Sequence, residues 1–399
     1  MKTLKICAQI ILICLLLAIP TVANAELQGQ LYGGNGIVTE DGESFNIGEF
    51  DKACADGNID AAKSIYNDWF KRRQAMLANG TKFDIFDLYL KFCYARILYL
   101  KQDYKACIAA EDEVLEYLRD HLNEGHEKDS DWIYQIYNSL RYKKSSYDTL
   151  KDYENSLRVQ ESLVEFLSSS LSSDDSNLLE EKMYLSSCYY NVHDYKTAIK
   201  ICEELLPQFE KVFGAKSDEF RDLRRRLAED YNRDARFTDE VKLYEEILKL
   251  DIEVYGETDE KTLRSYKKLM DRYYALEYYE KMGTLLNKVV PVVEKNLPDD
   301  SDIKRSILTD QATYYAFTHQ FQKSLEICER VIAMPISNGD KIGLLHRMAD
   351  NYRMLNDYSN ALNYILQAWD IYEKNFSENK YTRKLLLEEM SLIHSKIGN

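Results

Sequence analysis

The chain has 399 residues with 52 basic and 67 acidic side chains, so its formal net charge is −15. This acidity disfavours nucleic acid, which selects a basic surface, and anionic lipid surfaces. Only 5 prolines and 15 glycines are present, which fits a nearly all-helical chain because both residues disfavour helix interiors. A hydrophobic content of 45% is ample for a continuous core.

The N-terminus has the pattern of a secretory signal peptide. Lys2 and Lys5 precede an apolar run over residues 6–19, and Ala23-Asn24-Ala25 offers a small-residue cleavage site. The apolar run is short for a membrane span, and Ile13 before Cys14 does not match a lipoprotein signal. We therefore expect residues 1–25 to be removed and the mature chain, at a net charge of −17, to be exported: periplasmic or secreted if the source is bacterial, without stable membrane insertion.

Residues 26–46 form a Gly-rich N-terminal arm, which we expect to be mobile or to form a short extended segment. Residues 47–399 make up the remaining domain. Within it, residues 88–100 are apolar on nearly every side of the predicted helix, so this helix should be buried. Either the arm or the hairpin that precedes it covers the helix, or a partner does.

A pattern recurs at a stride of 42 residues through most of this domain. Its clearest position, called the anchor here, is aromatic in seven of eight units, and a Tyr stands six residues before it in six of them. Self-similarity at a period of 20 to 50 residues indicates a solenoid. The anchors are Ile59, Tyr104, Tyr153, Tyr195, Phe237, Tyr279, Phe321 and Tyr358.

Each unit has the features of a helical hairpin. A small residue stands nine before the anchor in five units, as at Ala228, and three after it in six units, as at Ala198, which lets two helices approach closely. Apolar residues from Ile199 to Phe209 follow a helical spacing and predict one buried face. Acids such as Asp194 directly precede the anchor and suit a helix start, where they accept hydrogen bonds from free N–H groups.

The spacing of Leu227, Ala228 and Tyr231, followed by a small residue such as Ala361 after the anchor, resembles the tetratricopeptide repeat. The longer stride resembles the repeats of kinesin light chains and of many bacterial proteins. Lys144 and Met270 depart from the pattern at positions for small residues. The resemblance implies an all-α fold: a right-handed α-solenoid of about eight hairpins over residues 47–399.

The last segment, residues 383–397, repeats only the first helix of a unit. A solenoid requires a closing helix with a polar outer face. We expect residues 383–397 to be this capping helix, with an outer face formed by Lys384, Glu388, Glu389 and Lys396.

No pattern of catalysis is evident. Four of the six cysteines after residue 25 occupy packing positions of the repeat, so we expect the cysteines to be reduced core residues, with Cys188 and Cys202 as the first pair to test. The six histidines are scattered, and no metal-binding spacing occurs. The sequence therefore predicts no enzyme, no cofactor and no metal site.

By the resemblance, the first helices of successive units line a concave groove. The hypothesis is a non-catalytic scaffold that binds a protein or peptide there. In the alternative interpretation, Arg225 with Glu229, Lys267 with Asp271 and His346 with Asp350 are only ion pairs on a solvated face. The candidate binding residues are Arg141, Tyr190, Arg225, Glu229, Asn232, Arg233, Arg264, Lys267, Asp271, Tyr274, His346 and Arg353.

Two further hypotheses stay open. Tyr190 and Tyr274 could serve as stacking platforms of a glycan-binding protein, and the array could be a sensor that signals through a separate polypeptide. For a peptide ligand, Arg225, Arg233, Arg264 and Lys267 outnumber Asp222, Glu229 and Asp271 by one charge. Because a concave wall concentrates an electric field and Arg matches a carboxylate, we expect an acidic partner.

Overall fold

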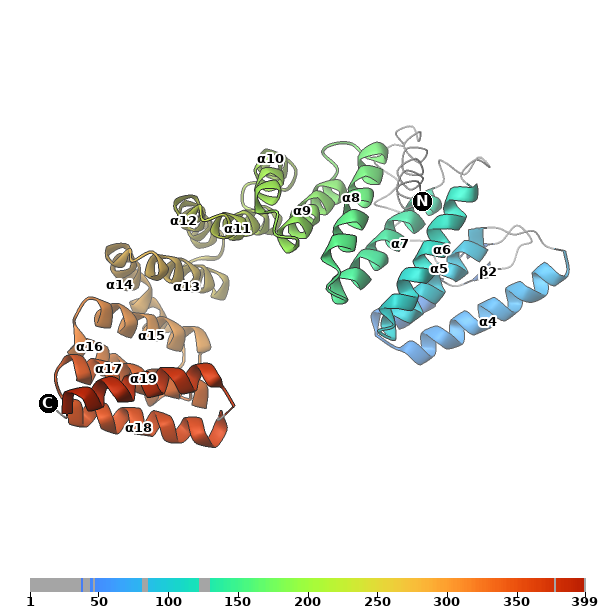
Figure 1. The fold of residues 1–399 in the computed structure, drawn as a ribbon. Helices are drawn as coiled ribbons and strands as arrows, with labels where there is room; N and C mark the ends of the chain where they lie inside the picture. The colour runs from blue at the N-terminus through green and yellow to red at the C-terminus, as the bar shows by residue number, and fades with distance from the viewer. Residues whose placement is uncertain are drawn as a thin grey trace, which may run out of the picture. The chain divides into compact units, whose positions relative to one another are not determined.

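The computed structural model describes residues 37–38, 44–45, 47–80, 85–121, 130–376 and 378–397. These residues are almost entirely helical, and they divide into two compact units at Asp234 (Figure 1). Most of the predicted arm and the whole predicted signal peptide, residues 1–25, lie outside the described residues. Among the described residues, no helix is long and apolar enough to cross a membrane.

Unit 1 contains a small hairpin of β1 (Ile37–Val38) and β2 (Ser44–Phe45), then helices that pack on one another in chain order. The helices of unit 1 are α3 (Ile47–Ala55), α4 (Ile59–Ala78), α5 (Ile85–Leu100), α6 (Tyr104–His121), α7 (Ser130–Thr149), α8 (Tyr153–Ser170), α9 (Ser176–Asn191), α10 (Tyr195–Phe213) and α11 (Asp218–Arg233).

Unit 2 continues the same arrangement of neighbouring helices. Its helices are α12 (Phe237–Tyr255), α13 (Glu260–Ala275), α14 (Tyr279–Asn296), α15 (Asp302–Phe317), α16 (Phe321–Ile332), α17 (Asn338–Met354), α18 (Tyr358–Asn375) and α19 (Lys380–Ile397).

All eight anchors are the first residue of a second helix, from Ile59 in α4 to Tyr358 in α18. The repeat therefore predicts the residue at which each second helix begins. Asp152, Asp194 and Asp357 cap the helices that follow, each accepting a hydrogen bond from the backbone N–H three residues on, at 3.1 to 3.3 Å. These side chains satisfy a donor that a helix start leaves without an intrahelical partner.

Each turn also contains one residue in the left-handed backbone region, two residues before the anchor. Only Gly57 among them is a glycine; the other seven have φ of 58° to 66°. A side chain in this conformation costs roughly 1–2 kcal/mol, so each of these turns stores some strain. The seven are Gln102, Lys151, His193, Ala235, Glu277, His319 and Asn356.

This strain gives the first prediction. Replacing Lys151 (φ 59°) by Gly should raise the free energy of unfolding by about 1 kcal/mol. The matched control is Lys200→Gly in the exposed interior of α10, which should lower it by about 1 kcal/mol because Gly disfavours a helix. Urea titration measures both changes, and a loss of stability in Lys151→Gly would contradict the explanation.

The small residues of the repeat are buried where helices meet. Ala228, Ala349, Ala198 and Ala361 are fully inaccessible. Met270 and Met282 take the corresponding positions in α13 and α14, where larger side chains should hold the helices apart. The backbones of α17 and α18 do lie in closer contact along their length than those of α13 and α14, in the direction that the small-residue rule predicts.

The recurring Tyr six residues before the anchor links one hairpin to the next. The hydroxyl of Tyr189 donates to Glu161, that of Tyr231 to Glu203 and that of Tyr273 to Glu245, at 2.6 to 2.8 Å. Each acceptor stands eight residues after the anchor of the preceding unit. The residue at the equivalent place before Tyr315 is Asn287, which carries no charge.

This difference supplies a matched pair of variants. Tyr273→Phe should lower the free energy of unfolding by about 1–2 kcal/mol, because it removes a hydrogen bond to a carboxylate. Tyr315→Phe, which removes no such bond to a carboxylate, should change it by less than about 0.5 kcal/mol. Equal effects of the two substitutions, measured by urea unfolding, would show that the ring alone matters.

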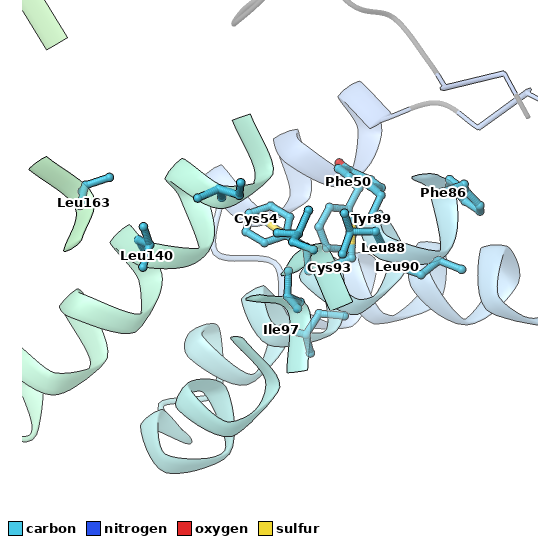
Figure 2. Close-up of a cluster of buried hydrophobic side chains, with 14 of the residues drawn as sticks. Phe50, Cys54, Phe86, Leu88, Tyr89, Leu90, Cys93, Ile97, Leu140 and Leu163 are labelled. Atoms are coloured by element: carbon cyan, nitrogen blue, oxygen red, sulfur yellow. The ribbon is translucent and has the colours of Figure 1, made fainter. Parts of the chain in front are cut away.

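The apolar helix predicted at residues 88–100 is α5, and its surroundings confirm that it is buried (Figure 2). Phe50 and Cys54 of α3 and Trp69 of α4 pack against it. Phe45 of the arm stacks on Phe86 with ring centroids 3.8 Å apart. Both the end of the arm and the first hairpin therefore cover this helix, as one of the two sequence interpretations predicts.

The capping helix is α19, and one part of its prediction is wrong. Lys384, Glu388 and Lys396 are exposed as expected, but Glu389 is buried and binds Arg353 of α17 at 2.8 Å. A carboxylate on the inner face is stable here because it has a guanidinium partner. The outer face carries Leu387 and Leu392 in addition to its polar residues.

The six described cysteines are buried as predicted and carry free thiols. Cys188 lies against Ser156 of α8, whereas Cys202 lies against Ser186 and Asp230. Burial raises the pKa of Cys202 to about 12, so its thiol is a weak nucleophile. Their reduced state in the isolated protein remains a prediction, which thiol titration of the denatured, unreduced chain tests.

Candidate interaction surface on the first helices of the hairpins

The predicted binding residues lie on the first helices of their hairpins, in both units. Unit 1 holds Arg141 on α7, Tyr190 on α9 and, on α11, Arg225, Glu229, Asn232 and Arg233. Unit 2 holds Arg264, Lys267, Asp271 and Tyr274 on α13, with His346 and Arg353 on α17. The first-helix surface of each unit is considered by itself.

Arg141 is held in place between α7 and α9. Its guanidinium lies 5.3 Å from the ring centre of Tyr137 and donates to the Tyr137 hydroxyl at 3.2 Å. That hydroxyl donates to Glu181, which is buried, receives a second hydrogen bond from Gln160 and lies 3.6 Å from Arg141. About half of the Arg141 side chain stays exposed, so an oriented guanidinium faces solvent.

Tyr190 and Arg233 form a second pair, between α9 and α11. Arg233 donates through Nε to the Tyr190 hydroxyl at 2.8 Å, and its guanidinium lies 5.7 Å from the ring centre. Tyr195 packs edge-on against Tyr190. Tyr190 is therefore no open stacking platform, because Arg233 and Tyr195 occupy its sides.

The remaining charges of α11 do not pair as predicted. Arg225 forms its ion pair with Asp222, three residues before it, at 2.8 Å, while Glu229 is exposed and Asn232 is half-buried. The expected pair of Arg225 with Glu229 is not what the structure shows. A spacing of three places Asp222 on the same face of the helix and nearer to Arg225.

In unit 2, carboxylates neutralise the predicted cations. Lys267 binds Asp271, as expected, and also Asp310 of α15 at 3.2 Å, and Arg264 binds Glu260 at 2.5 Å. Burial raises the pKa of Asp310 to about 6, with Lys267 opposing the shift. The sequence count that gave one excess positive charge omitted Asp310 and Glu260. In this unit, therefore, the local charge gives no support for an acidic ligand.

Tyr274 belongs to an exposed aromatic cluster. Phe317 of α15 meets it edge-on at 5.1 Å and stacks on Tyr279 at 5.7 Å, and Tyr274 and Phe317 each keep about two fifths of their surface exposed. Such a cluster offers apolar ring area to a ligand. Of the two predicted glycan platforms, Tyr190 and Tyr274, only Tyr274 belongs to a cluster whose rings are accessible to a ligand.

The two candidates on α17 have different roles. Arg353 binds Asp350 and the buried Glu389 of α19, so it joins these helices. His346 is half-buried, and burial lowers its pKa although Asp350 opposes the shift. No ion pair joins His346 and Asp350 among the described contacts, so that expected pair is not found. Neither residue has the exposure of Arg141.

Sequence reasoning missed Tyr137, Tyr184 and Glu181. Tyr184 is exposed on α9, and the ammonium of Lys144 lies 5.8 Å from its ring centre. Tyr137 could have been found from the sequence, because an aromatic residue four positions before Arg141 lies on the same face of the helix. In the part of the chain that the structure describes, no cluster of metal-binding side chains occurs.

Comparisons with known proteins bear on the fold. No protein-family model matches the chain, and no curated protein matches its sequence. The structure resembles apo RapI with a TM-score of 0.52 and 12% identity, over 88% of this chain and 97% of that one.

Two further similar structures cover less of the chain. One is a putative kinesin light chain of Podosopora anserina with nearly identical TPR-like repeats, at a TM-score of 0.45 and 19% identity over 49% of this chain and 93% of that one. The other is BtubC from P. vanneervenii, at 0.43 and 16% over 61% and 91%. The described chain is thus an all-α array of tetratricopeptide-like hairpins, similar in fold to RapI.

Proposed function

We propose that this chain is an exported, non-catalytic scaffold that binds a segment of a partner polypeptide on the first helices of unit 1. The observation that carries the proposal is a set of side chains on three successive first helices: the exposed Arg141, Tyr184 and Arg233, and the half-buried Tyr190 that orients Arg233. Arginine and tyrosine are enriched among residues that dominate binding energy.

Orientation before binding strengthens this surface. Arg141 is fixed by Tyr137 and Glu181, and Arg233 by Tyr190, so less side-chain entropy is lost when a ligand binds. Arg233 uses Nε for Tyr190, which leaves its two Nη groups directed elsewhere. A pair of Nη groups matches the two oxygens of a carboxylate, so a Glu, an Asp or a chain terminus of the partner suits this position.

Photo-crosslinking in the full chain tests this proposal. Benzoylphenylalanine at Asn232 should capture a partner, whereas the same group at Lys200, on the exposed side of α10, should not. With that partner purified, Arg141→Ala together with Arg233→Ala should weaken binding at least about tenfold. Lys200→Ala is the matched control.

Salt provides an independent measure. Raising it from about 0.05 M to about 0.5 M should weaken binding, because exposed charge pairs are screened. If neither the double substitution nor added salt changes the affinity, the charged residues of α7 and α11 are only a solvated surface and the proposal fails.

Glycan binding is the second candidate, favoured by the open cluster of Tyr274 and Phe317 in unit 2. Rings of this kind stack on the apolar faces of sugars. Soluble oligosaccharides should then bind, and Tyr274→Ala with Phe317→Ala should abolish binding while Arg233→Ala leaves it unchanged. A sensor acting through a separate polypeptide would use the peptide surface of unit 1.

Export rests on the leader pattern of residues 1–25. The mature protein recovered from outside the cytoplasm should begin at Glu26. An intact mass that includes residues 1–25, or that carries acyl chains, would reject this part of the proposal.

A further inference from the structure

A trough of about 460 Å³ lies along α4, α5 and α6 in unit 1. Tyr66 and Phe70 of α4 and Tyr94 of α5 form its aromatic lining, and Ala106 and Ala110 of α6 line the opposite wall. Tyr66 stacks on Phe70, with ring centroids 5.8 Å apart, and lies 5.9 Å from Tyr94. Phe70 and Tyr94 keep 44% and 46% of their surface exposed.

The repeat shows that these positions belong to the interior of the solenoid. Tyr66 is the seventh residue after its anchor and is only half-buried, whereas the seventh residue is buried in all the other hairpins. Those equivalents are Glu111, Gln160, Cys202, Tyr244, Leu286, Cys328 and Ile365.

Tyr94 departs from the repeat in the same way. It is the tenth residue before its anchor, and the equivalents in three later hairpins are Leu227, Leu269 and Met348, each only 1% exposed. The equivalents in the other three, Lys143, Leu185 and Gln311, are half-buried. The first two hairpins therefore leave open a surface that three later hairpins close.

A small residue creates the open space. Ala110 is the sixth residue after its anchor, where every other hairpin has a larger apolar side chain. In addition, Leu98 stands where later hairpins have the Tyr that donates to the preceding second helix, so no such link joins α4 to α5. The larger equivalents of Ala110 are Ile65, Val159, Ile201, Leu243, Leu285, Ile327 and Tyr364.

The rim of the trough carries charges of both signs on each side. By helical spacing, Asp60 lies beside Lys63 and Lys71 on α4, and Lys105 lies beside Glu116 on α6. Within the trough, Glu113 pairs with Lys91 of α5 at 3.2 Å. The charges therefore give a ligand no preferred direction across the trough.

We propose that this trough is a docking site for one amphipathic helix of a partner protein. The lining from Tyr66 to Leu77 extends over about 17 Å, or roughly three helical turns. A helix placed there covers positions that helices cover elsewhere in this chain, as in helix-in-groove recognition. This site is separate from the arginine surface proposed above.

The test uses a synthetic amphipathic helix of about 14 residues as a fluorescent probe, with Leu on one face and a mixture of Glu and Lys on the other. It should bind the full chain saturably. Ala110→Leu, which restores the residue type of the other hairpins, should weaken binding at least tenfold. Ala75→Leu, on an exposed face of α4 away from the trough, is the matched control and should change nothing.

Should Ala110→Leu impair folding, Phe70→Ala with Tyr94→Ala replaces it, since both rings are exposed.

Three results overturn the proposal: equal binding by wild type and Ala110→Leu, absence of probe binding, and binding of an oligosaccharide in place of the helix with the same dependence on Ala110. A cross-link from residue 70 to another part of the same chain overturns it too, because the trough then has an internal occupant. Arg141→Ala with Arg233→Ala should leave probe binding unchanged, which separates this site from the proposed peptide surface.

Discussion

Replacing Asp87 by Ala should lower the free energy of unfolding by about 3–5 kcal/mol. Asp87 of α5 binds Arg73 of α4 in a bidentate pair, with Nε to Oδ1 at 3.0 Å and Nη2 to Oδ2 at 2.8 Å. Arg73 is fully buried, so the substitution leaves its charge without its carboxylate in a site that water does not reach.

Removing both charges should cost far less than removing one. In Arg73→Met with Asp87→Leu, hydrophobic contacts replace the ion pair, and we expect stability within about 1.5 kcal/mol of wild type. The exposed pair of Lys384 and Glu388 is the matched control: Glu388→Ala should cost less than about 0.5 kcal/mol. Urea unfolding measures all three variants. A small loss in Asp87→Ala would mean that water enters between α4 and α5.

The sequence predicts the positions of the helices well because the same residue pattern recurs at a regular spacing, and each recurrence marks the start of a helix. An aromatic anchor recurs at 42 residues, and each anchor begins a helix. The backbone conformation of the turns was not predicted. Lys151 and Glu277 adopt a backbone conformation that usually signals Gly, and the hairpin geometry imposes it on side chains that give no local sign of a turn.

The contacts between helices were predicted only in part. Glu161, Glu203 and Glu245 recur at the same 42-residue stride as the Tyr residues they bind, so the period contains these links. By contrast, Asp310 and Glu389 change the charge of the candidate surface from neighbouring helices. Only a structure brings residues of different helices together, which is why counting charges within one helix gave the wrong balance at Lys267.

Glu111 is an acid in a core position. It is the seventh residue after its anchor, Tyr104. This position is buried in the later hairpins, and Glu111 is itself fully buried. Neither of its carboxylate oxygens accepts a hydrogen bond from a described residue. Burial raises the pKa of Glu111 to about 8, although Ser139 and Lys143 of α7 and Arg96 of α5 oppose the shift. The carboxyl group is therefore protonated at neutral pH.

The sign of the pH dependence follows from this shift. Between its ordinary pKa of 4.5 and about 8, Glu111 holds a proton in the folded chain that the unfolded chain has released. Its contribution to stability is thus fully present below pH 4.5 and is lost as the pH rises through 8. At about 1.4 kcal/mol per pKa unit, the loss is on the order of 5 kcal/mol.

Glu111→Gln should remove this dependence, because an amide is uncharged at every pH. Asp230 and Asp310, whose pKa values burial raises to about 7 and about 6, also titrate in this range. The quantity to measure is therefore the difference in unfolding free energy between variant and wild type at about pH 5 and about pH 9. This difference should grow with pH in favour of the Glu111→Gln variant, by on the order of 4 kcal/mol. A difference that stays flat would mean that Glu111 is solvated in the folded chain.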